Sequence, residues 1–505
     1  MAFGLFKKTQ HADLIFCNGT IYTSDFNQPK AEAVAVKDGR ILWVGAEEEM
    51  EPFRGPHTEE WDLEGAYLLP GFIELKGHPV LRTFLHRGLK LETEAGRQEA
   101  AEALGAFAAG HPELPAYFGF GYSDLLFSDQ DHLGAKELLD AVCPDKPVLL
   151  LSRSGRQGWC NSCALEMAEA FAREDRAAAL ALQDDDDEEE ENQAPSVPGF
   201  LQDPQPGVHY FTRDEEGWPT GVLMDVLPIL FVIDAADPFC VESLPEAAEA
   251  AGRELSRRGY TSVFDCGGPD YLDNYYIAAL TTLLQEGLPP HRFFGSVTLM
   301  GNPHPQRAVA RLLQKNTACL ECSEFMAFTT LRVLVTEYEG ALTPRPEILE
   351  ALCVEAGDRG CNVQLFPQGE AAMEAAVNAF SALRRAGYKK NRLILSYDAS
   401  SSWDAETGAI LQDLAVILDG PREELSAEAA IDSLTIDAAW FLRRENELGS
   451  IEKGKAADFV LLEQDPYQWT GPLSDIPVAM TFLGGEAVYE KEEEGEEEEE
   501  ILEDA

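Results

Sequence analysis

A chain of 505 residues with 45% hydrophobic residues is long enough for one large domain and a smaller one. Its net charge of −51 argues against nucleic acid and anionic membrane surfaces as partners, because like charges repel. No apolar run approaches the ~20 residues of a membrane helix, and the apolar run at the start is too short for a secretory signal, so we expect a cytoplasmic protein.

The first part of the chain has the pattern of short strands. Strands are predicted over residues 12–19 and 20–23, and again over 31–36 and 41–45. The last two flank Lys37-Asp38-Gly39-Arg40, which is typical of a β-hairpin turn because glycine adopts positive φ without strain.

The middle of the chain alternates short apolar runs with alanine-rich amphipathic stretches. Helices are predicted over 246–258 and 370–385. Strands are predicted over 147–152, 261–265, 292–299, 331–335, 362–366 and 392–396. Strands that alternate with helices indicate parallel β/α units, and this number of units predicts a (β/α)8-type TIM barrel.

The end of the chain returns to strands. A turn and a buried strand are predicted over 448–462, and a second hairpin over 478–489 turns at Gly484-Gly485. We therefore predict a composite β-sandwich domain from 12–65 and 444–490, with a barrel domain over 66–443 inserted in it.

Two acidic runs account for part of the charge. Asp184–Glu191 lies in a predicted surface loop over 182–206, and the second run belongs to a predicted disordered tail over 491–505. We interpret both as solvated sequence, because nothing near them fixes a coordination geometry.

Two CxxC pairs, Cys160/Cys163 and Cys319/Cys322, leave two interpretations open. Paired motifs of this kind can bind zinc or act in redox chemistry. The pairs lie far apart in sequence, and the first sits at a predicted helix start capped by Asn161 or Ser162, so buried free thiols are favoured.

Several blocks, in this order, resemble the amidohydrolase superfamily, most closely its YtcJ-like branch (the amidohydrolase-3 group). Residues 69–79 resemble the first barrel strand, L-P-G-F-I-D-x-H-x-H, and 448–462 resemble the closing L-G-S-I-x-x-G-K-x-A-D-x-V-x-L. The other blocks that resemble the family are 145–162, 217–223 and 259–265.

The resemblance implies hydrolysis of a non-peptide C–N bond in a small-molecule substrate. In the family, histidines and an aspartate hold a divalent metal, here expected to be zinc, and the metal activates water for attack on a carbonyl carbon. Because family members are often dimers, the resemblance also implies a homodimer.

The expected metal ligands are mostly replaced. Lys76 stands where the first strand normally has its first histidine, and only His78 remains. Where the family reads V-K-x-F-x-D-G, this chain has Arg332 in the lysine position, and where it reads V-H-x-H, Gln364 and Phe366 replace both histidines. Lysine and arginine are poor ligands because they are normally protonated.

Asp398 allows two alignments. The block 392–398 matches either a strand that normally ends in histidine or the last strand with its G-S-D, in which case Asp398 is the retained aspartate. The residues that follow are too few for the family's remaining strands, so we expect one or two β/α units to be missing and the barrel to be incomplete.

Three hypotheses follow for function. A hydrolase would hold metal through His78 and Asp398, with help from Glu74 or Glu337. Alternatively, the chain is a catalytically inactive homologue that acts as a binding or scaffold protein. A third hypothesis uses Lys76 as a base or Schiff-base nucleophile. By resemblance, the substrate pocket would contain these four residues: Arg156, Trp159, Arg332 and Gln364.

Overall fold

The computed structural model describes residues 10–127, 132–181, 210–267, 271–287, 289–338, 341–397, 403–419 and 426–491. The chain forms two compact units. The first gathers residues 1–78, 252–267 and 288–505, and the second gathers 79–251 and 268–287. None of the helices in the described ranges combines the length and the apolar composition needed to cross a bilayer.

Two sheets of the first unit are built from the ends of the chain. One sheet has the order β5 (Arg40–Gly45), β4 (Ala33–Lys37), β1 (Leu14–Cys17), β6 (Glu59–Asp62). The other has the order β24 (Glu486–Glu490), β23 (Val478–Leu483), β22 (Phe459–Leu462), β7 (Tyr67–Pro70), β2 (Thr20–Tyr22), β3 (Lys30–Ala31). Both ends of the chain therefore meet in one sheet, where Val460 pairs with Leu69. Apolar side chains of both sheets, such as Phe16 and Phe482, share one buried cluster.

Both predicted hairpins are confirmed. β4 and β5 pair antiparallel up to Lys37 and Arg40, and the turn residues Asp38 and Gly39 have φ of 50° and 72°. Gly484 and Gly485 have φ of 59° and 84° between β23 and β24. Positive φ at both central positions gives a turn whose twist matches that of the strands.

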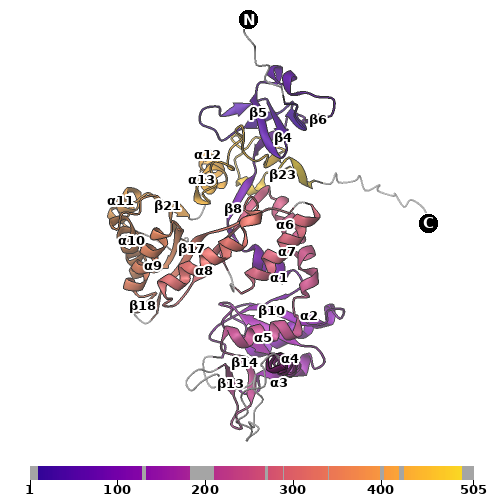
Figure 1. Ribbon diagram of the computed structural model, residues 1–505, viewed down its shortest axis with the longest axis vertical. Coiled ribbons are helices and arrows are strands. Elements are labelled where there is room, and N and C mark those ends of the chain that lie inside the picture. The colour runs from indigo at the N-terminus through magenta and orange to yellow at the C-terminus, as the bar shows by residue number, and fades with distance from the viewer. Residues whose placement is uncertain are drawn as a thin grey trace, which may run out of the picture. The chain divides into compact units, whose positions relative to one another are not determined.

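A curled parallel sheet forms the rest of the first unit. Its order is β21 (Val416–Asp419), β20 (Leu393–Ser396), β19 (Asn362–Gln368), β17 (Met326–Tyr338), β16 (Arg292–Leu299), β15 (Tyr260–Asp265), β8 (Phe72–Gly77), and β18 (Ala341–Thr343) pairs with β17. Its helices are α8 (Pro305–Ala318), α9 (Pro346–Asp358), α10 (Glu370–Arg385), α11 (Ala405–Asp413), α12 (Ala427–Leu434) and α13 (Ile436–Phe441). Figure 1 shows α8, α9 and α10 beside this sheet, and α8 and α10 contact β17.

The register divides the parallel sheet into two faces. Val297, Leu331 and Val363 are neighbours on adjacent strands and lie on one face. Phe264 and Phe294 are neighbours on the other face, where they join a buried cluster with Ala438 and Phe441 of α13. Both faces are buried along much of the sheet, as expected for parallel strands.

The second unit contains a mixed sheet. Its order is β13 (Phe211–Arg213), β14 (Pro219–Leu223), β12 (Gly158–Cys160), β11 (Val148–Ser152), β10 (Tyr117–Tyr122), β9 (Leu89–Lys90). Its helices are α1 (Pro79–Leu85), α2 (Arg97–Gly110), α3 (Ala135–Val142), α4 (Ser162–Ala181), α5 (Val226–Ala236) and α7 (Asp273–Glu286), and α6 (Leu244–Ser256) spans the boundary at residue 251. Asn161 caps α4 as predicted, since its Oδ1 accepts from the backbone N–H of Ala164 at 3.0 Å.

One expectation about the parallel strands was wrong, and one strand was not foreseen. The strand predicted over 147–152 forms as β11 but pairs with β10 and β12 in the mixed sheet, so it does not join the parallel sheet. The chain beyond residue 398 also adds a further parallel strand, β21, which we had not expected. Within the described residues the sheet has seven parallel strands, with β21 and β8 at its two edges, one fewer than a complete (β/α)8 barrel. The acidic loop 182–206 lies outside the described residues, as does nearly all of the tail.

Candidate functional site

A polar row crosses one face of the parallel sheet. Thr298 of β16 is the register neighbour of Arg332 of β17, which in turn neighbours Gln364 of β19. Register neighbours in adjacent parallel strands point to the same face. Because Thr298 lies four residues beyond Phe294 on one strand, this is the face that carries the Phe264–Phe294 cluster.

Arg332 lies partly buried within this row. Its guanidinium carbon is 5.7 Å from the centre of the Phe366 ring, which belongs to the same face of β19. Within the described part of the chain, its buried Nε has no hydrogen-bond partner. A buried donor without an acceptor costs free energy, so this position suits a ligand oxygen.

Gln364 provides a complementary group. Its side chain is 1% exposed, and its Nε2 donates a 2.7 Å hydrogen bond to Oγ of Ser396 at the end of β20. The described residues give its buried Oε1 no partner. The row therefore presents a donor on Arg332 and an acceptor on Gln364 on neighbouring strands.

The end of β8 carries the other predicted residues. The Glu74 carboxylate accepts a 2.7 Å hydrogen bond from the backbone N–H of Lys76, whose side chain is exposed. His78 is also exposed, and its Nδ1 lies 2.9 Å from the carbonyl oxygen of Gly267. Because a carbonyl only accepts, Nδ1 carries the proton in this contact, an arrangement also found in metal-binding histidines.

Gly267 is required at this position. It has a φ of 81°, and a Cβ added to it would lie 1.9 Å from Oγ1 of Thr298. That hydroxyl donates to the carbonyl of Cys266 at 3.1 Å. The glycine therefore lets the turn after β15 approach the polar row and His78 together.

The described residues do not fit a divalent metal. Among them, no group of three or more histidine, cysteine, aspartate or glutamate side chains comes together. In the polar row, Arg332 is a permanent cation that repels a metal ion, and Gln364 offers one neutral oxygen. Glu337 is exposed near the end of β17, and Asp398 lies outside the described residues.

The four cysteines of the two CxxC pairs form no disulfide, and the other six cysteines of the chain, which also lie in the described ranges, form none either. Burial raises the pKa of Cys160, whose side chain is fully buried. Burial likewise raises the pKa of Cys319 to about 11. Both thiols are therefore protonated near neutral pH, which is unfavourable for metal binding and for redox chemistry.

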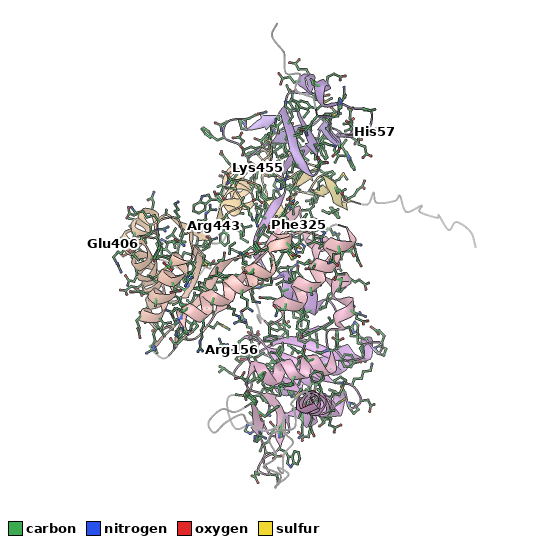
Figure 2. The ribbon with its side chains drawn as sticks, viewed as in Figure 1. His57, Arg156, Phe325, Glu406, Arg443 and Lys455 are labelled. Carbon is green, nitrogen blue, oxygen red and sulfur yellow. The ribbon has the colours of Figure 1, made fainter. Side chains whose placement is uncertain are left out.

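Arg156 and Trp159 belong to the second unit, whereas the other predicted site residues belong to the first. Arg156 is exposed after β11 (Figure 2), and its backbone N–H donates to Ser154 Oγ at 3.2 Å. The Trp159 indole is fully buried, donates to the carbonyl of Ala135 at 2.9 Å and packs edge-on against Phe127. Trp159 is thus a core residue of that unit.

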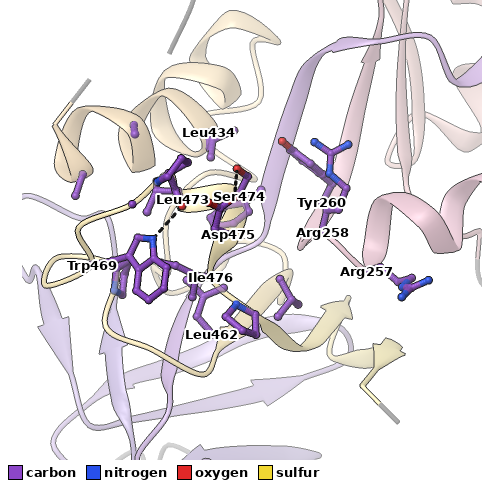
Figure 3. A pocket seen from close by; sticks show the side chains of 18 of the residues that line it. Arg257, Arg258, Tyr260, Leu434, Leu462, Trp469, Leu473, Ser474, Asp475 and Ile476 are labelled. Atoms are coloured by element: carbon purple, nitrogen blue, oxygen red, sulfur yellow. Dashed lines mark hydrogen bonds between the residues drawn. The ribbon is translucent and has the colours of Figure 1, made fainter. Parts of the chain in front are cut away.

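The first unit also has a cleft of about 720 Å³ that the sequence did not predict (Figure 3). It is lined by the loop between β22 and β23, one face of α12 and the starts of β8 and β15. Nothing in the sequence marked it, because its walls come from segments far apart in the chain.

Comparison with known proteins identifies relatives of this chain. The model of the amidohydrolase family matches residues 59–197 and 397–489. Residues 198–396, which include β15, β16, β17, β19 and β20, lie outside the match. The blocks at the two ends of the chain therefore carry the family pattern better than the strands that form the polar row.

Two curated proteins and one solved structure illustrate the similarity. The exoenzymes regulatory protein AepA of Pectobacterium carotovorum is 29% identical to this chain over 289 residues. The aligned part is 56% of this chain and 55% of AepA, so the chain spans about half the length of this relative. The N-substituted formamide deformylase of Arthrobacter pascens is 22% identical over 96% of this chain and 99% of its own length. An uncharacterized metal-dependent hydrolase from Pyrococcus furiosus shares the fold, with a TM-score of 0.55 and 17% identity over 90% of this chain and 100% of its own.

Proposed function

Because the chain belongs to the amidohydrolase family, in its amidohydrolase-3 branch, we propose that it is a member that binds a small molecule and has lost metal-dependent hydrolysis. The polar row is the binding site in this proposal. The observation that carries it is the pairing in register of Arg332 with Gln364, each of which has a buried polar atom without a hydrogen-bond partner among the described residues.

The chemistry of the row supports binding of a neutral or anionic polar ligand. Arg332 Nε would donate to a ligand oxygen, and Gln364 Oε1 would accept from a ligand N–H or O–H. The Phe366 ring beneath the guanidinium would cover an apolar part of the same ligand. A divalent cation at this place would face the charge of Arg332 directly.

Hydrolysis of a non-peptide C–N bond is the second candidate function. This candidate is supported by the formamide deformylase, which aligns with almost the whole chain. In this alternative, His78 and Asp398 would be the residues that hold a zinc ion, and the chemistry of such an ion would be activation of water. The described residues offer no third ligand beside His78.

The finer architecture belongs to the same proposal. We take the seven parallel strands as part of a (β/α)8-type barrel and the two sheets of the chain ends as a β-sandwich. The domain limits at residues 65, 443 and 490, a homodimer, a cytoplasmic location and the absence of nucleic-acid or membrane partners stay predictions.

Arg332→Met tests the role of the row. We expect this variant to lose ligand binding while its free energy of unfolding rises by about 1 kcal/mol, because a buried donor without a partner is removed. A panel of small carboxylic acids and primary amides is screened by ligand-observed NMR, and stability is measured by urea unfolding.

The control is Arg345→Met, which removes an arginine that is exposed between β18 and α9. This control should keep both binding and stability. If Arg332→Met instead kept its ligands and unfolded more easily, Arg332 would be a structural residue and the proposed site would be wrong.

A further inference from the structure

The cleft in the first unit lies at the end of the parallel sheet away from the polar row. Phe72 and Tyr260, which line it, are the first residues of β8 and β15, whereas Arg332 and Gln364 lie further along their strands. We call it the Trp469 cleft. The lining residues used below are Arg257, Arg258, Tyr260, Leu434, Trp469 and Asp475.

The loop over residues 463–477 is a preformed wall of this cleft. Its two ends are joined by a 3.1 Å hydrogen bond from the Glu463 N–H to the carbonyl of Pro477. Within the loop, the Trp469 indole N–H donates to the carbonyl of Pro472 at 3.0 Å, as the dashed line in Figure 3 marks. Compact loops closed in this way are frequently functional.

The loop is also fastened to the sheet behind it. The Tyr22 hydroxyl donates to the Asp465 carboxylate at 3.0 Å, and the Tyr22 ring lies 4.6 Å from the ring of Tyr467. A ligand entering the cleft would therefore meet a wall that is already ordered, which lowers the entropic cost of binding.

The walls are mainly apolar, and one side is cationic. α12 contributes Ala427, Ala430 and Leu434, which share one face of the helix by their spacing. Opposite the loop, Arg257 and Arg258 follow α6 (Figure 3), and the Arg258 guanidinium lies 5.2 Å from the centre of the Tyr260 ring.

We propose that the Trp469 cleft binds an organic anion with a flat, apolar body. Its volume of about 720 Å³ is that of a small-molecule site, and such sites combine apolar walls with a few polar groups. The charged residues that line the cleft are two arginines and one carboxylate, Asp475, so its lining carries a net positive charge in a chain whose net charge is −51. The arginines would hold the anionic group, and Trp469 and Leu434 would contact the flat body.

The test uses two fluorescent probes of similar ring size. 8-Anilinonaphthalene-1-sulfonate is an aromatic anion, and N-phenyl-1-naphthylamine is its neutral counterpart. In fluorescence titrations, Arg257→Gln/Arg258→Gln should weaken sulfonate binding about tenfold, the loss expected for two half-exposed charge contacts, and should leave the affinity for the neutral probe unchanged. Trp469→Leu should weaken binding of both probes.

The controls separate this site from non-specific binding. Arg359→Gln removes an exposed arginine elsewhere in the first unit and should change neither affinity. Added salt should weaken sulfonate binding to the wild type but not to the double arginine variant. The proposal would be overturned if the wild type and the double arginine variant bound the sulfonate equally tightly, or if neither bound it. It would also be overturned if the double variant lost binding of both probes while its melting temperature stayed unchanged.

Discussion

Replacing Asp458 by alanine is expected to lower the free energy of unfolding of the first unit by about 3–5 kcal/mol, the cost of breaking a buried ion pair. Asp458 precedes β22 and forms a bidentate pair with Arg292 of β16, with Nε–Oδ2 and Nη2–Oδ1 distances of 2.7 and 3.0 Å. The two side chains are only 3% and 5% exposed. Asp458 also accepts from the backbone N–H of Gly484 at 2.8 Å, so alanine removes the acceptor of three N–H donors, two on Arg292 and one on Gly484.

The pair connects the parallel sheet to the sheet that both chain ends form. Burial lowers the pKa of Arg292, but the charge and hydrogen bonds of Asp458, together with the charges of Glu324 and Glu447, outweigh burial, so the pKa is raised. Without Asp458 the guanidinium would remain charged in an apolar setting. Urea unfolding followed by circular dichroism measures the loss, and hydrogen exchange of β16 and β22 locates it.

Two further variants control this prediction. Glu463→Ala breaks the exposed pair with Lys491 and should cost less than about 1 kcal/mol. Arg292→Met/Asp458→Leu should recover most of the stability, because it removes both charges together. If Asp458→Ala cost no more than Glu463→Ala, the pair would contribute little to holding the sheets together.

His291 is expected to make the protein less stable in mild acid. The residue precedes β16 and is 1% exposed, and burial lowers its pKa to about 4. The unfolded chain takes up the proton near its ordinary pKa of 6.5, whereas the folded chain does so only near 4. The contribution of neutral His291 to the free energy of unfolding is therefore fully present above the unfolded-state pKa of 6.5. It is lost progressively as the pH falls toward the folded-state pKa of about 4. Between pH 7.5 and 5.0 the loss from this group is about 2 kcal/mol.

The measurement is urea unfolding at both pH values for wild type and for His291→Leu. The leucine variant carries no titrating group, so its stability should change less with pH than that of the wild type by about 2 kcal/mol. His57→Gln, which removes an exposed imidazole before β6 (Figure 2), should follow the wild type. Parallel curves for wild type and His291→Leu would show that His291 is not held neutral by burial.

Local turn chemistry made parts of the fold predictable. The hairpin turns at Asp38-Gly39 and Gly484-Gly485 depend on residues next to one another, so the sequence alone defines them. The strand over 147–152 has the same apolar pattern whether it joins the parallel sheet or the mixed sheet, and the sequence could not assign its partners. β21 has four residues and follows a helix without a strong boundary signal, so it was missed.

The candidate site was only partly predictable for a similar reason. The family pattern marked Arg332 and Gln364 as departures, but their pairing across strands and the contact with Ser396 required the register. The Arg292–Asp458 pair joins residues 166 positions apart, and no local pattern connects them. The placement of Trp159 in a core was equally hidden, because an aromatic residue has the same sequence signature in a core and in a pocket.

Metal content tests the central claim, that a binding site has replaced the metal centre. The chain would be expressed with added zinc and manganese, purified without chelators and analysed by elemental mass spectrometry beside His78→Ala and Asp398→Ala. We predict far less than one ion per chain, with the same trace amount in all three proteins. One zinc or manganese ion per wild-type chain, absent from both variants, would contradict the proposal and favour metal-dependent hydrolysis at His78 and Asp398.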